Sequence, residues 1–224
     1  MKRTKLADRI LPTYTKGEEI FNMISHIVGG AFGIAVTVLC IIMAAVHHNV
    51  YGVVSSSIYG ATMIILYTMS SIYHGLSPRT TGKKVFQILD HCTIFLLIAG
   101  SYTPFALCTF REYSPALGWS LFGIIWAVAI LGIVLNAIDL KRYKVFSMIC
   151  YIGMGWAIIC KANLFPMLIG VKGTILLVSG GIVYTIGAIL YGLGRNHKYM
   201  HSMFHLCILL ASILQFFCIL FYVL

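Results

Sequence analysis

Seven apolar runs, each long enough to cross a lipid bilayer, divide this sequence. A transmembrane helix needs about 20 consecutive, mainly apolar residues. The composition agrees, because 60% of the residues are hydrophobic and only 10% are charged. We therefore predict an all-α membrane protein, folded as a bundle of seven transmembrane helices. The runs cover residues 22–46, 53–75, 85–108, 117–138, 145–163, 173–193 and 201–223.

The first 21 residues are rich in charge and lack the apolar segment of a cleaved signal peptide. We expect residues 1–21 to form a cytoplasmic tail and residues 22–224 to form one seven-helix transmembrane domain. The expected location is the plasma membrane, which the chain crosses several times.

The basic residues fall unevenly on the two sides of this arrangement. Cytoplasmic loops of membrane proteins carry an excess of Lys and Arg. With the N-terminus in the cytoplasm, thirteen of the sixteen basic residues are cytoplasmic, which predicts an external C-terminus. They lie between apolar runs and form no groove with interleaved aromatic residues, so nucleic acid is not an expected partner. The thirteen are Lys2, Arg3, Lys5, Arg9, Lys16, Arg79, Lys83, Lys84, Lys141, Arg142, Lys144, Arg195 and Lys198; the three external ones are Arg111, Lys161 and Lys172.

Two histidines open the last apolar run, in the sequence HSMFH. His201 and His205 are one helical turn apart, so they project from the same helix face about 5–6 Å from each other. Ionisable residues inside a membrane are costly and are functional candidates by default. Two histidines at this spacing are typical of a metal clamp.

The predicted topology brings further polar residues to the same membrane depth. His74 ends the second run, Ser70 precedes it by one turn, and Asp90 lies near the start of the third run. Three protein ligands and one open position define a catalytic zinc site, so we predict Zn²⁺ held by His74, His201 and His205. Zinc lowers the pKa of bound water towards 7. Asp90 would accept a proton from this water or orient the water, and Ser70 would hold the water or donate to a developing oxyanion. Asp90 is also a candidate fourth ligand.

Other interpretations of these histidines are polar contacts between helices and interfacial contacts with lipid headgroups. The convergence of several polar groups in one leaflet favours the metal. His91 points about 100° away from Asp90 around its helix, so we do not expect it to be a ligand. His47 and His48 lie in the opposite loop, where we expect a solvated turn.

These residues resemble the motifs of a known family. EEIFNMISH carries Glu18, Asn22 and His26, SSIYH carries Ser70 and His74, LDHCTIFLLIAGSYTPF carries Asp90, and HSMFH closes the series. Together and in this order they resemble the haemolysin III branch of the progestin and adipoQ receptor family, within the CREST superfamily that includes the alkaline ceramidases. The short tail and compact loops resemble those of bacterial members.

The resemblance implies a seven-helix fold with its N-terminus inside and zinc held by three histidines, which map to His74, His201 and His205. It also implies an Asp and a Ser that contact the metal through water, which map to Asp90 and Ser70. Relatives are associated with ceramidase-like hydrolysis and with membrane lipid or energetic homeostasis.

The first motif, EEIFNMISH, places Glu18, Asn22 and His26 on one stripe of the first helix, near the same leaflet. We interpret this stripe as a buried polar network that braces the metal ligands. A direct part in substrate binding is the alternative.

Three functions compete for this sequence. The first is a zinc-dependent hydrolase that cleaves an amide or ester bond, with membrane lipids as partners and as the possible substrate. The second is a sensor or homeostasis protein with structural zinc, although structural zinc usually has four protein ligands. The third, a toxin, is disfavoured, because a pore-forming toxin needs a soluble form and this chain has seven apolar runs. Three histidines beside an Asp and a Ser favour the hydrolase.

Reporter fusions at the two ends of the chain test the predicted topology. The uneven distribution of Lys and Arg places the N-terminus in the cytoplasm and the C-terminus outside. A reporter active only in the cytoplasm should therefore give signal at the N-terminus and none at the C-terminus. Signal from the same side at both ends would contradict the assignment of seven spans.

Overall fold

The structure is a computed structural model that describes residues 3–194 and 197–224. It is all-helical, and the described residues include seven helical spans long and apolar enough to cross a membrane, which confirms the predicted fold class. Lys2 and Arg195, two of the predicted cytoplasmic cations, lie outside the described residues. The spans are α1 (Lys16–Val46), α2 (Val50–Gly75), α3 (Thr81–Pro104) continued by η1 (Phe105–Phe110) and α4 (Arg111–Tyr113), α5 (Pro115–Asp139), α6 (Lys144–Trp156) continued by η2 (Ala157–Leu164) and α7 (Phe165–Leu168), α8 (Gly170–Leu193) and α9 (Met200–Tyr222).

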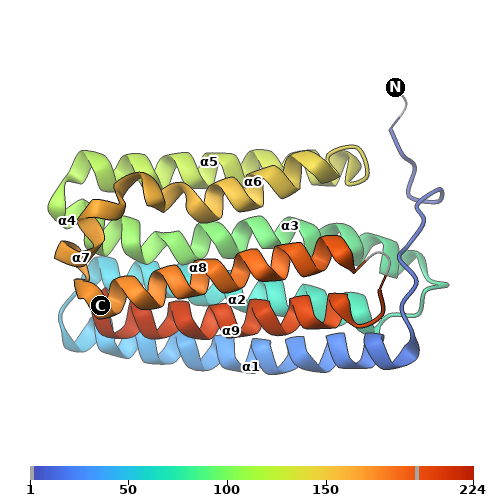
Figure 1. Cartoon of the computed structure of the whole chain (residues 1–224), viewed down its shortest axis with the longest axis horizontal. Coiled ribbons are helices and arrows are strands. Elements are labelled where there is room, and N and C mark those ends of the chain that lie inside the picture. Colours follow the sequence, from blue (N-terminus) through green and yellow to red (C-terminus); the bar gives the residue numbers. More distant parts are fainter. Residues whose placement is uncertain (1–2, 195–196) are drawn as a thin grey trace.

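Consecutive spans run in alternating directions along the bundle (Figure 1). As a result, the starts of four spans and the ends of three gather at one end of the molecule. We call this the basic end; there lie the starts of α1, α3, α6 and α9 and the ends of α2, α5 and α8. It is the end that the sequence predicts to face the cytoplasm.

The first helix is longer than the apolar run that predicts it. It begins at Lys16, so residues 16–21, which the sequence assigns to the tail, are helical. The reason is a capping box: the Thr15 hydroxyl accepts the Glu18 N–H at 3.3 Å, and Glu18 Oε2 accepts the Thr15 N–H at 2.8 Å. Hydropathy alone places the start where the apolar residues start, whereas the cap places it a turn and a half earlier.

Two spans depart from regular α-helix near the opposite end of the bundle. Pro104 lacks a backbone N–H, and the six buried residues after it, Phe105–Phe110, form a π-helix. The fifth span ends its α-helix at Trp156 and continues as 3-10 turns, with Lys161 outside helical backbone angles at φ −125°.

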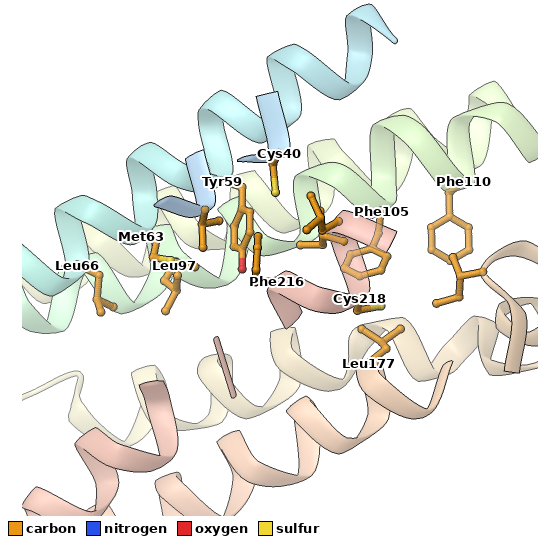
Figure 2. Close-up of a cluster of buried hydrophobic side chains, with 14 of the residues drawn as sticks. Cys40, Tyr59, Met63, Leu66, Leu97, Phe105, Phe110, Leu177, Phe216 and Cys218 are labelled. Atoms are coloured by element: carbon orange, nitrogen blue, oxygen red, sulfur yellow. The ribbon is translucent and has the colours of Figure 1, made fainter. Parts of the chain in front are cut away.

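The main apolar core joins the first three helices to α8 and α9. Figure 2 shows this cluster, in which Tyr59 of α2 lies beside Phe216 of α9, and Cys218 of α9 lies near Leu177 of α8. Burial is greatest along the third span and least along the fifth, where α6 has Ser147 and Met154 as its buried residues. The fold therefore has a tightly packed side around α3 and a lipid-exposed side at α6.

The segment before α1 lies across the basic end of the bundle. The Thr4 N–H donates to Asp139 Oδ2 at 2.8 Å, at the end of α5, and the Arg9 guanidinium donates to Gln87 Oε1 at 2.9 Å, on α3. Burial raises the pKa of Tyr14, so its phenol stays neutral. This segment therefore covers the site described below.

Gly118 gives a test of how α5 packs against α4 and η1. A Cβ atom there would lie 2.5 Å from the backbone N and Cα of Arg111 and 2.6 Å from the Ala106 carbonyl oxygen, and none of these atoms can rotate away. We expect Gly118→Ala to reduce the free energy of unfolding by about 1–3 kcal/mol, the usual cost of overpacking.

Gly123→Ala is the matched control on the same helix, because a Cβ atom there meets nothing within 4 Å. Thermal melting of the two variants in detergent is the measurement. Equal melting temperatures for both variants would show that α5 does not pack against α4 as described.

Candidate metal centre

Three histidines from two helices meet at the basic end. His74 lies in the last turn of α2, and His201 and His205 lie on one face of the first turns of α9. The Nε2 atoms of His201 and His205 are 3.1 Å apart, and those of His201 and His74 are 3.4 Å apart. All three side chains are buried. The structure thus brings together the three residues that the sequence proposes as ligands.

The spacing of these nitrogens fits a tetrahedral metal ion. With metal–nitrogen bonds of 2.0–2.1 Å, two ligand atoms of a tetrahedron are about 3.3–3.4 Å apart. The observed separations of 3.1 and 3.4 Å lie close to this value. Each histidine offers one ring nitrogen, and these atoms all lie within 4.8 Å of one another. The cluster can therefore hold a metal ion with three protein ligands.

Glu19 sets the orientation of the His74 ring. Its Oε2 atom lies 2.7 Å from His74 Nδ1. A carboxylate can only accept, so Nδ1 carries the proton and Nε2 presents its lone pair to the cluster. Sequence reasoning did not single out Glu19; the available signal was an acidic residue next to Glu18 at the start of an apolar run.

Glu18 contacts the start of α9, the helix that carries His201 and His205. Its Oε2 atom caps α1 through Thr15, and its Oε1 atom accepts the N–H of Tyr199 at 2.7 Å. Tyr199 is the residue before α9 and has a left-handed backbone, with φ +61°. Glu18 therefore holds the start of α9, and with it the position of His201, against the start of α1.

Asn22 and His26, the other two residues of the predicted polar stripe, are buried beside the cluster. The His26 ring stacks on His205 with centroids 3.8 Å apart and meets the edge of Tyr67 at 5.0 Å. Within the described residues, the side-chain nitrogen and oxygen atoms of Asn22 and His26 have no hydrogen-bond partner. His26 thus contacts the predicted ligand His205 through its ring face, whereas the hydrogen bond to His74 comes from Glu19.

Aromatic rings enclose the cluster from the basic end. The Tyr14 ring stacks on His201 with centroids 4.9 Å apart and an interplanar angle of 18°. Tyr191 of α8 lies on another side of the same histidine, at 5.8 Å. The ligands are therefore shielded from the surface by the segment before α1 and by α8.

A cavity of about 340 Å³ leads away from the cluster between α3, α6, α8 and α9. His205 and His26 line it at one end, and its walls are mainly apolar. Asp90 and Ser70 also line it, so the predicted catalytic residues share one space with a predicted ligand. A cavity of this size and lining is typical of a small-molecule site.

The remaining histidines singled out by the sequence lie elsewhere. His91 Nδ1 is 2.9 Å from the Gln87 carbonyl oxygen and its Nε2 is 3.1 Å from the Tyr191 hydroxyl, so both nitrogens are engaged in hydrogen bonds. His47, at the opposite end of the bundle, lies 2.9 Å from the carbonyl oxygen of Leu224. Neither belongs to the cluster.

Fold and site together define a class: a multi-pass integral membrane protein with a buried cluster of three histidines beside an apolar cavity. The family model described as "Haemolysin-III related" matches residues 14–216. The chain therefore belongs to the haemolysin III-related family, and its spans are consistent with a bacterial cell membrane.

Named relatives support this assignment. Hemolysin-3 of Bacillus cereus is 43% identical over 209 residues, which cover 92% of each chain. The Hemolysin-3 homolog of Bacillus subtilis (strain 168) is 37% identical over 210 residues, covering 93% of this chain and 96% of the relative. The human Monocyte to macrophage differentiation factor, of the progestin and adipoQ receptor family, is 25% identical over 170 residues, covering 74% of this chain and 69% of the relative.

Removal of single histidines tests whether the cluster holds a metal. We expect protein purified in detergent to carry about one divalent metal ion per chain, because three imidazoles at these distances suit one tetrahedral ion. His74→Ala, His201→Ala and His205→Ala should each lower the metal content sharply in elemental analysis. His47→Ala, at the opposite end, should leave it unchanged. Metal content that is unaffected by all three cluster variants would refute the site.

Proposed function

We propose that the protein is a zinc-dependent hydrolase that cleaves an amide or ester bond of a membrane lipid. The observation that carries the proposal is that one ligand of the histidine cluster, His205, lines the same apolar cavity as Asp90 and Ser70. A nucleophile-generating site inside an apolar cavity suits a substrate that is itself mostly apolar.

Zinc is the metal that this donor set favours. His74, His201 and His205 supply three neutral imidazoles, and zinc commonly takes three protein ligands in catalytic sites. Bound zinc supplies Lewis acidity, which polarises a carbonyl group and acidifies water. The Glu19 contact supports the proposal, because zinc-binding histidines usually donate their second N–H to a carboxylate or carbonyl.

Asp90 and Ser70 have the chemistry to serve this reaction. The Asp90 carboxylate can accept the proton of an attacking water and later return it to the leaving group. The Ser70 hydroxyl can donate a hydrogen bond to the carbonyl oxygen as negative charge develops there. Ser70 lies one turn before His74 on α2, so both are held by one rigid helix.

The cavity fits the acyl part of a lipid. It runs from the cluster along the bundle, with Ile94, Leu97 and Leu177 among its lining residues. Its α6 wall belongs to the most exposed span, whose outer surface is apolar. A lipid with its scissile bond near the basic end would place its chain along this space.

A second candidate is a sensor or homeostasis protein in which zinc is structural. The ligands come from α2 and α9, which are far apart in the sequence, so a bound metal would also cross-link two helices. In that case Asp90 would serve as the fourth ligand and no lipid would be cleaved. The test below separates the two.

Replacement of the proposed general base is the decisive experiment. We expect Asp90→Asn to keep the fold and most of the zinc but to lower turnover at least about 100-fold, the usual loss for removal of a general base. Ser70→Ala should cost less, because zinc also stabilises the oxyanion. Fatty-acid release from a panel of lipids in nanodiscs is the measurement, with zinc-stripped wild type as the reference for no activity.

Two outcomes would decide against the hydrolase. One is wild-type protein that contains zinc but releases no fatty acid from any lipid of the panel. The other is Asp90→Asn protein that works as well as wild type. Loss of zinc in Asp90→Asn would identify this residue as a ligand and favour structural zinc.

A further inference from the structure

Lys83 is a buried cation beside the metal centre. It lies in the first turn of α3, and the sequence counts it among the cytoplasmic cations, yet the residue is only 1% exposed. Its Nζ donates to Glu19 Oε1 at 2.6 Å and to the Leu76 carbonyl oxygen at 3.0 Å, and it lies 5.0 Å from the centre of the Tyr73 ring. Its contacts therefore converge on the end of α2, which carries His74.

The two oxygens of Glu19 divide between Lys83 and a metal-cluster histidine. Oε1 accepts from Lys83 and Oε2 accepts from His74 Nδ1. Glu19 is partly buried, and a carboxylate withdrawn from water is more stable when it is paired and hydrogen-bonded. Lys83 supplies an opposite charge and a hydrogen bond to the carboxylate that contacts the His74 ring.

The second contact of Lys83 acts on the backbone. Leu76 is the residue that caps the end of α2, two residues after His74. The bond from Lys83 to its carbonyl oxygen ties this end of α2 to the start of α3. One ammonium group thus restrains the ring of His74 through Glu19 and its backbone through Leu76.

We propose that Lys83 is a positioning residue for the metal centre, acting on His74 chiefly through Glu19. The inference rests on the metal site of the proposed function and adds a residue that lies outside the motifs of the sequence. The neighbouring Lys84 provides the contrast: it also lies in the first turn of α3, but its Nζ donates to the Ala7 carbonyl oxygen and does not contact Glu19.

The test compares zinc affinity in purified, folded protein. Lys83→Met removes the charge and keeps an apolar stem, and we expect the dissociation constant for zinc to rise about 10- to 100-fold, as for other residues that orient metal ligands. Lys84→Met, which removes the same charge one residue further along, should leave the constant unchanged. Competition with a chromophoric zinc chelator gives these values, and the visible absorption of cobalt-loaded protein reports ligand geometry.

A purely structural role for Lys83 predicts a different pattern. It would lower the melting temperature of the metal-free protein while zinc affinity and the cobalt spectrum of folded protein stayed as in wild type. Wild-type zinc affinity and an unchanged cobalt spectrum in Lys83→Met would therefore overturn the proposal.

Glu19→Gln and the double variant Glu19→Gln with Lys83→Met complete a double-mutant cycle of zinc affinity. If Lys83 acts through Glu19, the double variant should bind zinc as Glu19→Gln does, since interacting residues are not additive. The double variant leaves neither charge unpaired, so it also serves if Lys83→Met alone does not fold. Weaker zinc binding by the double variant than by Glu19→Gln would contradict an action of Lys83 through Glu19. Wild-type protein without metal would instead refute the proposed metal site, on which this inference rests.

Discussion

An ionisable side chain buried in a membrane protein must find its partner inside the protein, because the surrounding lipid offers none. The basic end of this bundle depends on that constraint. Glu19 lies between Lys83 and His74, and Glu18 lies between Thr15 and the backbone of Tyr199. Through these two carboxylates the starts of α1, α3 and α9 and the end of α2 are held in one arrangement. This arrangement sets the end of α2, with His74, beside the start of α9, which carries His201 and His205.

The two sides of the fold suit different parts of the proposed activity. The ligands and their carboxylate partners come from α1, α2 and α9, and α1 packs against both of the other helices. The cavity extends towards α6, which belongs to the least buried of the described spans. Histidines held by packed helices can keep a metal in place, while the cavity towards α6 can take an apolar substrate beside the metal.

Much of the fold could be predicted from hydropathy, and the departures have local causes. The capping box at Thr15 extends α1 beyond its apolar run, and Pro104 replaces regular helix with a π-helix. In the site, His74, His201 and His205 meet as the sequence proposes. Of the stripe of Glu18, Asn22 and His26, Glu18 contacts the start of α9, Asn22 is buried and His26 stacks on His205; its role as a network that braces the ligands stays a prediction.

The sequence by itself determined the seven helical spans and the common depth of the three histidines. Both follow from local properties, the length of an apolar run and the rise of a helix per residue. Only the tertiary structure decided that Glu19 orients His74, that Glu18 holds the start of α9, and that Lys83 is buried. Adjacent residues point about 100° apart around a helix, so the rotation of each helix against its neighbours selects the partner of each side chain. That rotation is set by packing across the whole bundle, which no single stretch of the sequence contains.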